Sequence, residues 1–198
     1  MQAIFASKNP GKIREAAAIL SAMGIDIVSM HEFGIDPDIV EDGDTFEANA
    51  LIKAKAVFNM NGHAAIADDS GLEIDWLDKK PGVRSARFMG EGTAYTVKNN
   101  MILQLLDGVP MKKRTARFVC AAAAVLGDGR ELVVRGEIEG YIALVSAGDN
   151  GFGYDPIFYV PEYGATMAQI PEEIKNRVSH RGIALKKLGA AIKESYRL

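Results

Sequence analysis

Two adjacent aspartates, Asp68 and Asp69, are followed in the sequence by Ser70 and Gly71. Residues 64–67 are typical of a short buried strand, so we interpret the acidic run as a turn at the end of that strand. Carboxylates held in this way can present oxygens to a hard cation. A solvated hairpin turn would explain the same short motif equally simply.

A second acidic pair, Glu41 and Asp42, lies in the loop-like segment 31–43. Its role can be limited to a favourable interaction with the dipole of the next helix. If it joined Asp68 and Asp69 in space, a divalent cation would be needed to neutralise the crowded charge. Carboxylate and water oxygens favour Mg²⁺, with Mn²⁺ as a possible substitute, over zinc. We therefore predict a metal site formed by Glu41, Asp68 and Asp69.

Residues 7–12, Ser-Lys-Asn-Pro-Gly-Lys, join the first predicted strand to a helix. Backbone N–H groups at the start of a helix attract anions, and Lys12 adds a full positive charge that could reach a phosphate. The stretch is not a Walker A loop, which needs Gly, four residues and then Gly-Lys-Ser/Thr. An ordinary capped helix with an exposed lysine is the alternative.

A glycine-rich loop, Gly148–Pro156, surrounds Phe152. Its glycines would allow the backbone to hold the aromatic ring against a flat ligand, while Asp155 could fix a polar edge of that ligand. A plain connection with Phe152 packed in the core would explain the loop as well.

Basic residues gather near the start of the predicted last helix. Lys175 and Asn176 precede Ser179, His180 and Arg181. Positive charge at a helix N-terminus opposes the helix dipole, so this placement indicates ligand contact, although a solvated face is an alternative.

The elements that must position these groups follow from hydrophobic periodicity and from breaker residues. The predicted strands are residues 2–6, 25–30, 64–67, 114–126, 131–139, 141–145 and 157–160. The predicted helices are residues 10–23, 44–61, 93–106 and the segment from 179 onward. A strand–helix–strand start and consecutive central strands predict a mixed β-sheet with flanking helices. We expect one α/β domain over residues 1–198, with two lobes and a central cleft.

Several of these helices carry recognisable start signals. Asp44 with Glu47 three residues later resembles a capping box, and Thr93 and Ser179 are the other predicted caps. The helix that follows Asp44 has an apolar stripe made of Phe46, Ala50, Ala54, Val57 and Phe58.

Composition narrows the class of protein. The chain has 198 residues, 48% hydrophobic and 25% charged, with a net charge of −3. These values are typical of a globular protein and argue against a nucleic-acid-binding surface. The longest apolar run, Val119–Leu126, is too short to span a membrane, and Cys120 is the single cysteine. We expect a cytoplasmic protein without membrane or nucleic-acid partners.

Six motifs in order resemble one family, the Ham1/RdgB-type inosine triphosphate pyrophosphatases, also called XTP/dITP diphosphatases. They are Ser7-x-Asn9-x-x-Lys12-x-x-Glu15, Thr45-Phe46 with Asn49-Ala50 and Lys53-Ala54, Ala67–Leu72, Pro81-Gly82 with Ser85–Phe88, Gly151–Pro156, and Lys175-Asn176 with Ser179–Arg181. The resemblance extends from Ser7 to about Ala184. Asp149-Asn150 departs from it, because small uncharged residues are expected there.

The resemblance implies an elongated, two-lobed mixed α/β fold, a homodimer, and magnesium-dependent hydrolysis of ITP, dITP and XTP to the monophosphate and pyrophosphate. It implies that Asp69 activates the water and that Glu41 helps to ligate the metal. The implied nucleotide-binding residues are Ser7, Lys8, Asn9, Pro10, Gly11, Lys12, Ser70, Phe152, Gly153, Tyr154, Asp155, Lys175, His180 and Arg181. Phe152 would stack on the purine, with donors from Lys175, His180 and Arg181 around its polar edge.

Two other functions stay open. A Maf-like pyrophosphatase for modified or pyrimidine triphosphates has a related architecture. A non-catalytic nucleotide sensor would keep the pocket, but it would gain little from crowded carboxylates. No Ser-His-Asp or Cys-His set is evident, so a covalent intermediate is not expected.

Overall fold

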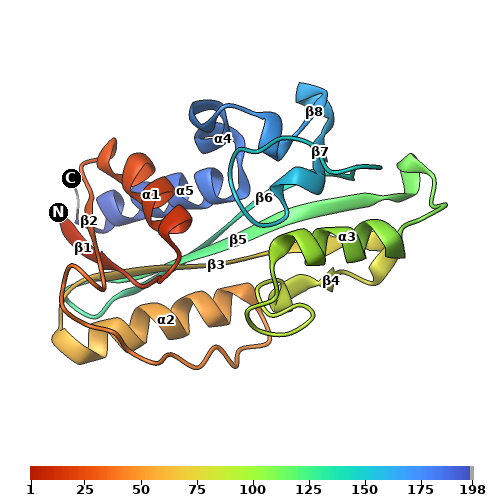
Figure 1. The fold of residues 1–198 in the computed structure, drawn as a ribbon. Helices are drawn as coiled ribbons and strands as arrows, with labels where there is room; N and C mark the ends of the chain where they lie inside the picture. Colours follow the sequence, from red (N-terminus) through yellow and green to blue (C-terminus); the bar gives the residue numbers. More distant parts are fainter. Residues whose placement is uncertain (197–198) are drawn as a thin grey trace. The chain divides into compact units, whose positions relative to one another are not determined.

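The computed structural model describes residues 1–196 and contains a mixed β-sheet with flanking helices (Figure 1). The strands are β1 (Gln2–Phe5), β2 (Asp26–Ser29), β3 (Ala65–Ile74), β4 (Lys80–Pro81), β5 (Thr115–Val125), β6 (Glu131–Ile142), β7 (Phe158–Val160) and β8 (Ala165–Thr166). The helices are α1 (Pro10–Ser21), α2 (Phe46–Asn61), α3 (Tyr95–Leu105), α4 (Glu172–Val178) and α5 (His180–Tyr196). None of the helices in this described part is long and apolar enough to cross a membrane.

The strand order in the sheet is β2-β1-β3-β5-β6-β7-β8, and β4 pairs with β3. β1 is parallel to β2 and to β3, whereas the pairs β3–β4, β6–β7 and β7–β8 are antiparallel. Parallel pairing at the start follows from the helical crossovers there, and antiparallel pairing follows from the short connections later in the chain. The predicted mixed α/β class is confirmed.

The chain divides into two compact units, of which unit 1 comprises Met1–Ser70, Cys120–Gly136 and the segment from Ser179 onward. Within unit 1, α1 packs beside α5 on one side of the strands, and α2 lies on the other side (Figure 1). The core between the strands and the helix pair includes Phe5, Leu20, Ile66, Ala122, Leu126, Leu185 and Leu188. Unit 1 therefore offers each face of its strands a different set of helical side chains.

Unit 2 comprises Gly71–Val119 and Glu137–Val178. Its core includes Leu72, Ile74, Ile102, Leu106, Phe118, Ile157 and Phe158. Apolar residues four apart on α3 and its C-terminal end, such as Ile102 and Leu106, face the strands, as an amphipathic helix requires.

The acidic run is the interior of a strand and not a turn. β3 (Ala65–Ile74) passes without interruption through Asp68 and Asp69, and Gly71 is a buried residue of the same strand without a positive φ. Leu72, just beyond it, is fully buried. Apolar burial before and after the run keeps the chain extended, so the turn preference of Asp, Ser and Gly is overridden and the predicted turn is wrong.

Two of the predicted helix caps also differ. The N-cap of α2 is Thr45 and not Asp44, because the Thr45 hydroxyl accepts a backbone N–H of the first turn at 3.1 Å. Thr93 does not cap α3, because its hydroxyl donates to a carbonyl of the preceding loop. Ser179 accepts a backbone N–H of α5 at 3.1 Å, which confirms that cap.

Candidate active site

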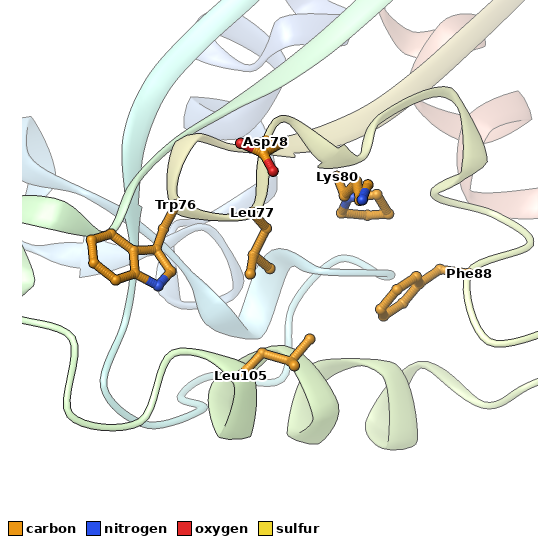
Figure 2. A pocket seen from close by; sticks show the side chains of 7 residues that line it. Trp76, Leu77, Asp78, Lys80, Phe88 and Leu105 are labelled. Atoms are coloured by element: carbon orange, nitrogen blue, oxygen red, sulfur yellow. The ribbon is translucent and has the colours of Figure 1, made fainter.

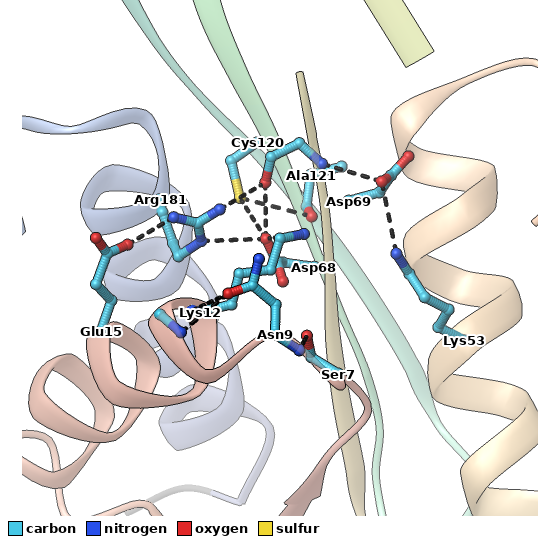
Figure 3. Close-up of polar contacts among 12 residues, drawn as sticks. Ser7, Asn9, Lys12, Glu15, Lys53, Asp68, Asp69, Cys120, Ala121 and Arg181 are labelled. Carbon is cyan, nitrogen blue, oxygen red and sulfur yellow. Dashed lines mark hydrogen bonds and ion pairs between the residues drawn. The ribbon is translucent and has the colours of Figure 1, made fainter. Parts of the chain in front are cut away.

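Asp68 is the fully buried centre of a charged network in unit 1 (Figure 3). Its Oδ2 lies 3.1 Å from Lys12 Nζ and 3.1 Å from Arg181 Nε, and it accepts a hydrogen bond from the Ser70 hydroxyl at 2.7 Å. Burial alone would raise the pKa of Asp68, but the charges of Lys12 and Arg181 outweigh burial and hold that pKa well below its usual range. Asp68 therefore stays ionised and anchors two cations.

Arg181 is also held by a second buried carboxylate, Glu15 of α1 (Figure 3). Nη1 donates to Glu15 Oε2 at 2.5 Å and Nη2 donates to the Ser70 hydroxyl at 3.2 Å. Burial lowers the pKa of Arg181, but Asp68 and Glu15 outweigh it, so the net shift is upward. Each guanidinium nitrogen thus has an acceptor, and the charge network connects α1 to α5 through β3.

Asp69 has a different set of neighbours, because successive side chains of a strand point to opposite faces. Asn49 of α2 donates from Nδ2 to Asp69 Oδ2 at 3.2 Å, and Lys53 Nζ lies 3.5 Å from Oδ1. Burial raises the pKa of Asp69 and Glu41 adds to that effect, while Lys53 and Lys12 offset only part of it. Neighbouring aspartates in one strand therefore have pKa values shifted in opposite directions.

Lys53 connects Asp69 to the acidic loop that precedes α2. Its ammonium lies 2.7 Å from Glu41 Oε2 as well as 3.5 Å from Asp69 Oδ1. Burial lowers the pKa of Lys53, but Asp69, Asp68 and Glu41 outweigh burial, so the ammonium stays charged. Asn49, one helical turn before Lys53, accepts the N–H of Gly43 at 2.8 Å and so fixes the same loop.

The turn before α1 is capped by its own side chain. Asn9 Oδ1 accepts the N–H groups of Gly11 and Lys12 at 2.9 and 3.3 Å, and Ser7 Oγ accepts the N–H of Asn9 at 3.2 Å. Asn9 therefore occupies two of the N–H groups that were expected to attract an anion. What this turn offers an anion is chiefly the charge of Lys12.

In unit 2, the glycine-rich loop is closed by a buried ion pair. Asp155 Oδ2 accepts the N–H of Phe152 at 2.9 Å and lies 2.7 Å from Lys175 Nζ. The same ammonium stands 5.2 Å from the centre of the Phe152 ring. Gly151 has a φ of 78°, and a Cβ there would collide with Asp155 and Lys175, so the loop requires glycine at this position.

The model of the Ham1 family matches residues 3–191 of this chain. The chain belongs to the Ham1 family. It is 48% identical to a protein of Nitratidesulfovibrio vulgaris named dITP/XTP pyrophosphatase, over 93% of this chain and 92% of that protein. It is 45% identical to one of Exiguobacterium sibiricum with the same name, over 97% of both chains.

Solved structures of the Ham1 family have the same fold. The Ham1 protein of Staphylococcus aureus superposes with a TM-score of 0.87 at 37% identity, covering 98% of this chain and 100% of the other. A HAM1 protein from Coxiella burnetii also gives 0.87, at 38% identity and with 98% and 99% coverage. The family resemblance read from the motifs is confirmed.

The carboxylates predicted to bind a metal in this Ham1 protein fall into two groups. Glu41 and Asp69 share the ammonium of Lys53, whereas Asp68 Oδ2 is taken by Lys12, and Asp68 Oδ1 is buried with no hydrogen-bond partner in the described part of the chain. Among residues 1–196 no three His, Cys, Asp or Glu side chains are grouped so that they could hold a metal ion. The oxygens of Glu41 and Asp69 suit a hard divalent cation, and the three-carboxylate site stays a prediction.

Some predicted ligand residues of unit 2 and of the surface use their side chains elsewhere. The Tyr154 hydroxyl donates to the carbonyl of Ser85 at 2.8 Å and the side chain is buried, so a ligand contact there would involve the backbone. Lys8 pairs with Asp36 at 2.6 Å in an exposed position. Lys175 lies on the short helix α4 and not at the start of α5.

The motif reading assigned no role to Asn49, Lys53 or Glu15, which the structure places beside Asp69 and Arg181. A signal for the first two was present. Asn49 and Lys53 fall four residues apart on the apolar stripe of α2, where polar side chains are buried at a cost unless they have partners. Glu15 likewise precedes the buried Ala16 of α1.

A pocket of about 240 Å³ in unit 2 contains none of the predicted site residues (Figure 2). Trp76, Leu77, Phe88 and Leu105 give it a largely apolar lining, which Asp78, Lys80 and Pro81 complete. An apolar lining of this kind suits an apolar group better than a polyphosphate.

Proposed function

We propose that this Ham1-family protein hydrolyses ITP, dITP and XTP to the nucleoside monophosphate and pyrophosphate. The names of its relatives, at 45–48% identity over nearly the whole length, support this activity. The observation that carries the proposal is the opposite pKa shift of Asp68 and Asp69, with cations beside both. Titratable neighbours driven apart in this way take different roles in acid–base chemistry.

In the proposed reaction, Asp69 accepts the proton of the attacking water. A general base is most effective when its pKa approaches the working pH, and burial moves the pKa of Asp69 upward. The water oxygen bonds to phosphorus, the phosphoanhydride bond breaks, and its electron pair leaves with pyrophosphate. Lys12 and Lys53 stabilise the negative charge that develops on the phosphate oxygens. Asp68 keeps Lys12 in place.

Magnesium is part of this proposal, with manganese as a substitute. A bound Mg²⁺ would neutralise charge on the polyphosphate and lower the pKa of water. Glu41 and Asp69 are the residues that would hold it, because their oxygens already converge on one cationic group. A homodimer and a cytoplasmic location stay predictions.

Base selectivity would follow from hydrogen bonding at the purine edge. Hypoxanthine and xanthine carry an acceptor at O6 and a donor at N1, whereas adenine has the opposite pair. In unit 2, Phe152 would stack on the ring and Lys175 would supply a donor, whereas donors from His180 and Arg181 stay a prediction from the motifs. A guanidinium has five N–H groups, so Arg181 can donate to a ligand while each of its nitrogens keeps its acceptor in the network. Adenine would leave buried groups unpaired, each at a cost of about 1–3 kcal/mol.

The test is a turnover panel with ITP, XTP, GTP, ATP and pyrimidine triphosphates, with separate assays for pyrophosphate and orthophosphate. We expect pyrophosphate as the product and a strong preference for ITP and XTP. A preference for pyrimidine triphosphates would favour the Maf-like alternative. Nucleotide binding without turnover would favour the sensor. Equal use of ATP and ITP would contradict the base-recognition model and leave the hydrolytic chemistry standing.

A further inference from the structure

We infer that Asn99 of α3 is a positioning residue for the loop Gly151–Asp155, and this inference rests on the role proposed for Phe152 in base recognition. Asn99 is 5% exposed, and its Nδ2 donates to the carbonyl oxygen of Gly153 at 3.1 Å. The next residue of the helix, Asn100, is exposed. Both groups of the hydrogen bond belong to unit 2.

The loop needs such a contact because of its glycines. Gly151 and Gly153 stand on either side of Phe152 with φ values of 78° and 71°. Glycine populates many backbone conformations when nothing restrains it, so the direction of the Phe152 ring depends on contacts made by its neighbours. On one side, Asp155 holds the N–H of Phe152. On the other side, Asn99 holds the peptide that follows Gly153.

Tyr154 continues the same attachment. Its hydroxyl donates to the Ser85 carbonyl at 2.8 Å, and the edge of its ring contacts Tyr95 of α3, with ring centres 5.2 Å apart. The Ser85 hydroxyl in turn donates to the carbonyl of Gly82 at 2.6 Å and accepts the N–H of Leu72 in β3. The loop is thus fastened, through its backbone and through Tyr154, to α3 and to the segment Gly82–Ser85 of unit 2.

A second observation indicates that the amide of Asn99 serves more than packing. Its Oδ1 is buried, and none of the residues from 1 to 196 offers it a hydrogen bond. Exchanging the amide oxygen and nitrogen would not remove the problem, because the oxygen would then face the Gly153 carbonyl. An unpaired buried acceptor costs free energy that a leucine of similar size would avoid. The donor that only the amide supplies, to Gly153, is what distinguishes asparagine here.

The experiment compares Asn99→Leu with the same substitution at the exposed neighbour, Asn100→Leu. Leucine removes both the unpaired oxygen and the donor, so the half-buried Gly153 loses the hydrogen bond to its carbonyl. We expect the melting temperature of Asn99→Leu to equal or exceed that of wild type. The dissociation constant of inosine 5′-monophosphate should rise about tenfold, the effect of one lost hydrogen bond of ordinary strength. The affinity for pyrophosphate should be unchanged.

Steady-state kinetics and a second variant complete the test. In Asn99→Leu we expect KM for ITP to rise with the monophosphate constant, while kcat stays within about twofold, because Asp69 and its partners are untouched. Tyr154→Phe should give the same pattern, and the double variant should show less than the sum of the two effects, since both groups hold one loop. If Asn99 had a structural role alone, Asn99→Leu would lower the melting temperature and would change the affinities for inosine 5′-monophosphate and pyrophosphate to the same extent.

The outcomes distinguish the inference from the proposed function. Unchanged monophosphate affinity in Asn99→Leu, with normal turnover of ITP by wild type, would overturn the inference and leave the function standing. Equal losses of monophosphate and pyrophosphate affinity would also overturn it. A wild-type protein that does not hydrolyse ITP would overturn both.

Discussion

In unit 1, buried cations pair with buried carboxylates, whereas in unit 2, apart from the Lys175–Asp155 pair, two buried cations donate to backbone carbonyls. Arg114 donates to three carbonyl oxygens at 2.6–2.8 Å, and Lys98 donates to the carbonyl of Ala86 at 2.5 Å. Burial lowers the pKa of both groups. In both cases the contacts fix the backbone, and for Arg114 the nearby Asp107 offsets part of the effect of burial.

The pairs of unit 1 do more than fix the chain. Lys12 and Arg181 keep Asp68 ionised, while burial raises the pKa of Asp69 on the opposite face of the same strand. Linked charges therefore produce two carboxylates of different acidity within one dipeptide. The comparison teaches that a buried cation tunes a reaction only when its partner is titratable, and the predictions below test that distinction.

The largest effect is expected for Asp69→Asn. The variant keeps the hydrogen-bonding shape but cannot accept a proton, so kcat for ITP should fall about 10²–10⁴-fold. Stability should be retained, because a raised pKa means that the ionised form is disfavoured in the fold. Stopped assays for pyrophosphate and a urea unfolding curve measure both quantities. Near-normal turnover would remove Asp69 from the role of base.

Asp68→Asn, in contrast to Asp69→Asn, should lower the free energy of unfolding. Removing this carboxylate leaves Lys12 and Arg181 partly uncompensated in a buried site, which costs about 3–5 kcal/mol of unfolding free energy. The matched control is Asp128→Asn, which breaks an exposed pair with Arg130 and should change stability far less. Urea unfolding of the three proteins decides the matter. Equal stability of the Asp68 and Asp128 variants would contradict the network.

Lys12→Ala separates the phosphate part of the ligand from the rest. Loss of a charged hydrogen bond should weaken ITP binding by about 1.5–3 kcal/mol and inosine binding far less. Lys55→Ala is a suitable control, because Lys55 pairs with Glu131 at an exposed position of unit 1. Calorimetry with both ligands, in Asp69→Asn to prevent turnover, gives the comparison. A similar loss for ITP and inosine would make Lys12 structural.

The sequence predicted the secondary-structure elements and the family better than it predicted which side chains interact with one another. Hydrophobic periodicity located α1, α2, α3 and α5 and most strands to within a few residues, because burial on one face leaves a regular pattern. The run of Asp68–Gly71 was misjudged, since turn propensity is local and the burial that overrides it comes from distant segments. The same error concealed the alternation that sends Asp68 and Asp69 to different helices.

Most of the interactions that the motifs did not predict join residues that are far apart in the sequence. Arg181 and Asp68 are 113 residues apart, and Asn49 and Asp69 are 20 apart. No local pattern states which cation meets which carboxylate, so the sequence could predict a charged site but not its division into two groups. The polar residues on the apolar stripe of α2 were the one local sign that buried charges in this region have partners.

The smallest effect concerns Asp75, a carboxylate of unit 2 at the end of β3. Burial would raise the pKa of Asp75, but hydrogen bonds from Lys79, Thr115 and Arg117 outweigh it and lower the pKa to about 2. The folded-state pKa is thus below the ordinary value of about 3.9. Asp75 therefore contributes stability that is fully present above about pH 4 and is lost as the pH falls through 2.

Asp75→Asn should consequently be less stable than wild type at neutral pH and equal to it near pH 2. Because 32% of the side chain is exposed, we expect a difference within about 1 kcal/mol, decreasing in 1 M salt. Unfolding curves from pH 2 to pH 7 measure it, and kcat for ITP should not change at neutral pH, since Asp75 is engaged by Lys79, Thr115 and Arg117 within unit 2. A difference that grew toward low pH would reverse the sign of the linkage. A large loss of kcat would contradict the distinction between the units, because a surface carboxylate of unit 2 would then affect the reaction as the buried charges of unit 1 are expected to do.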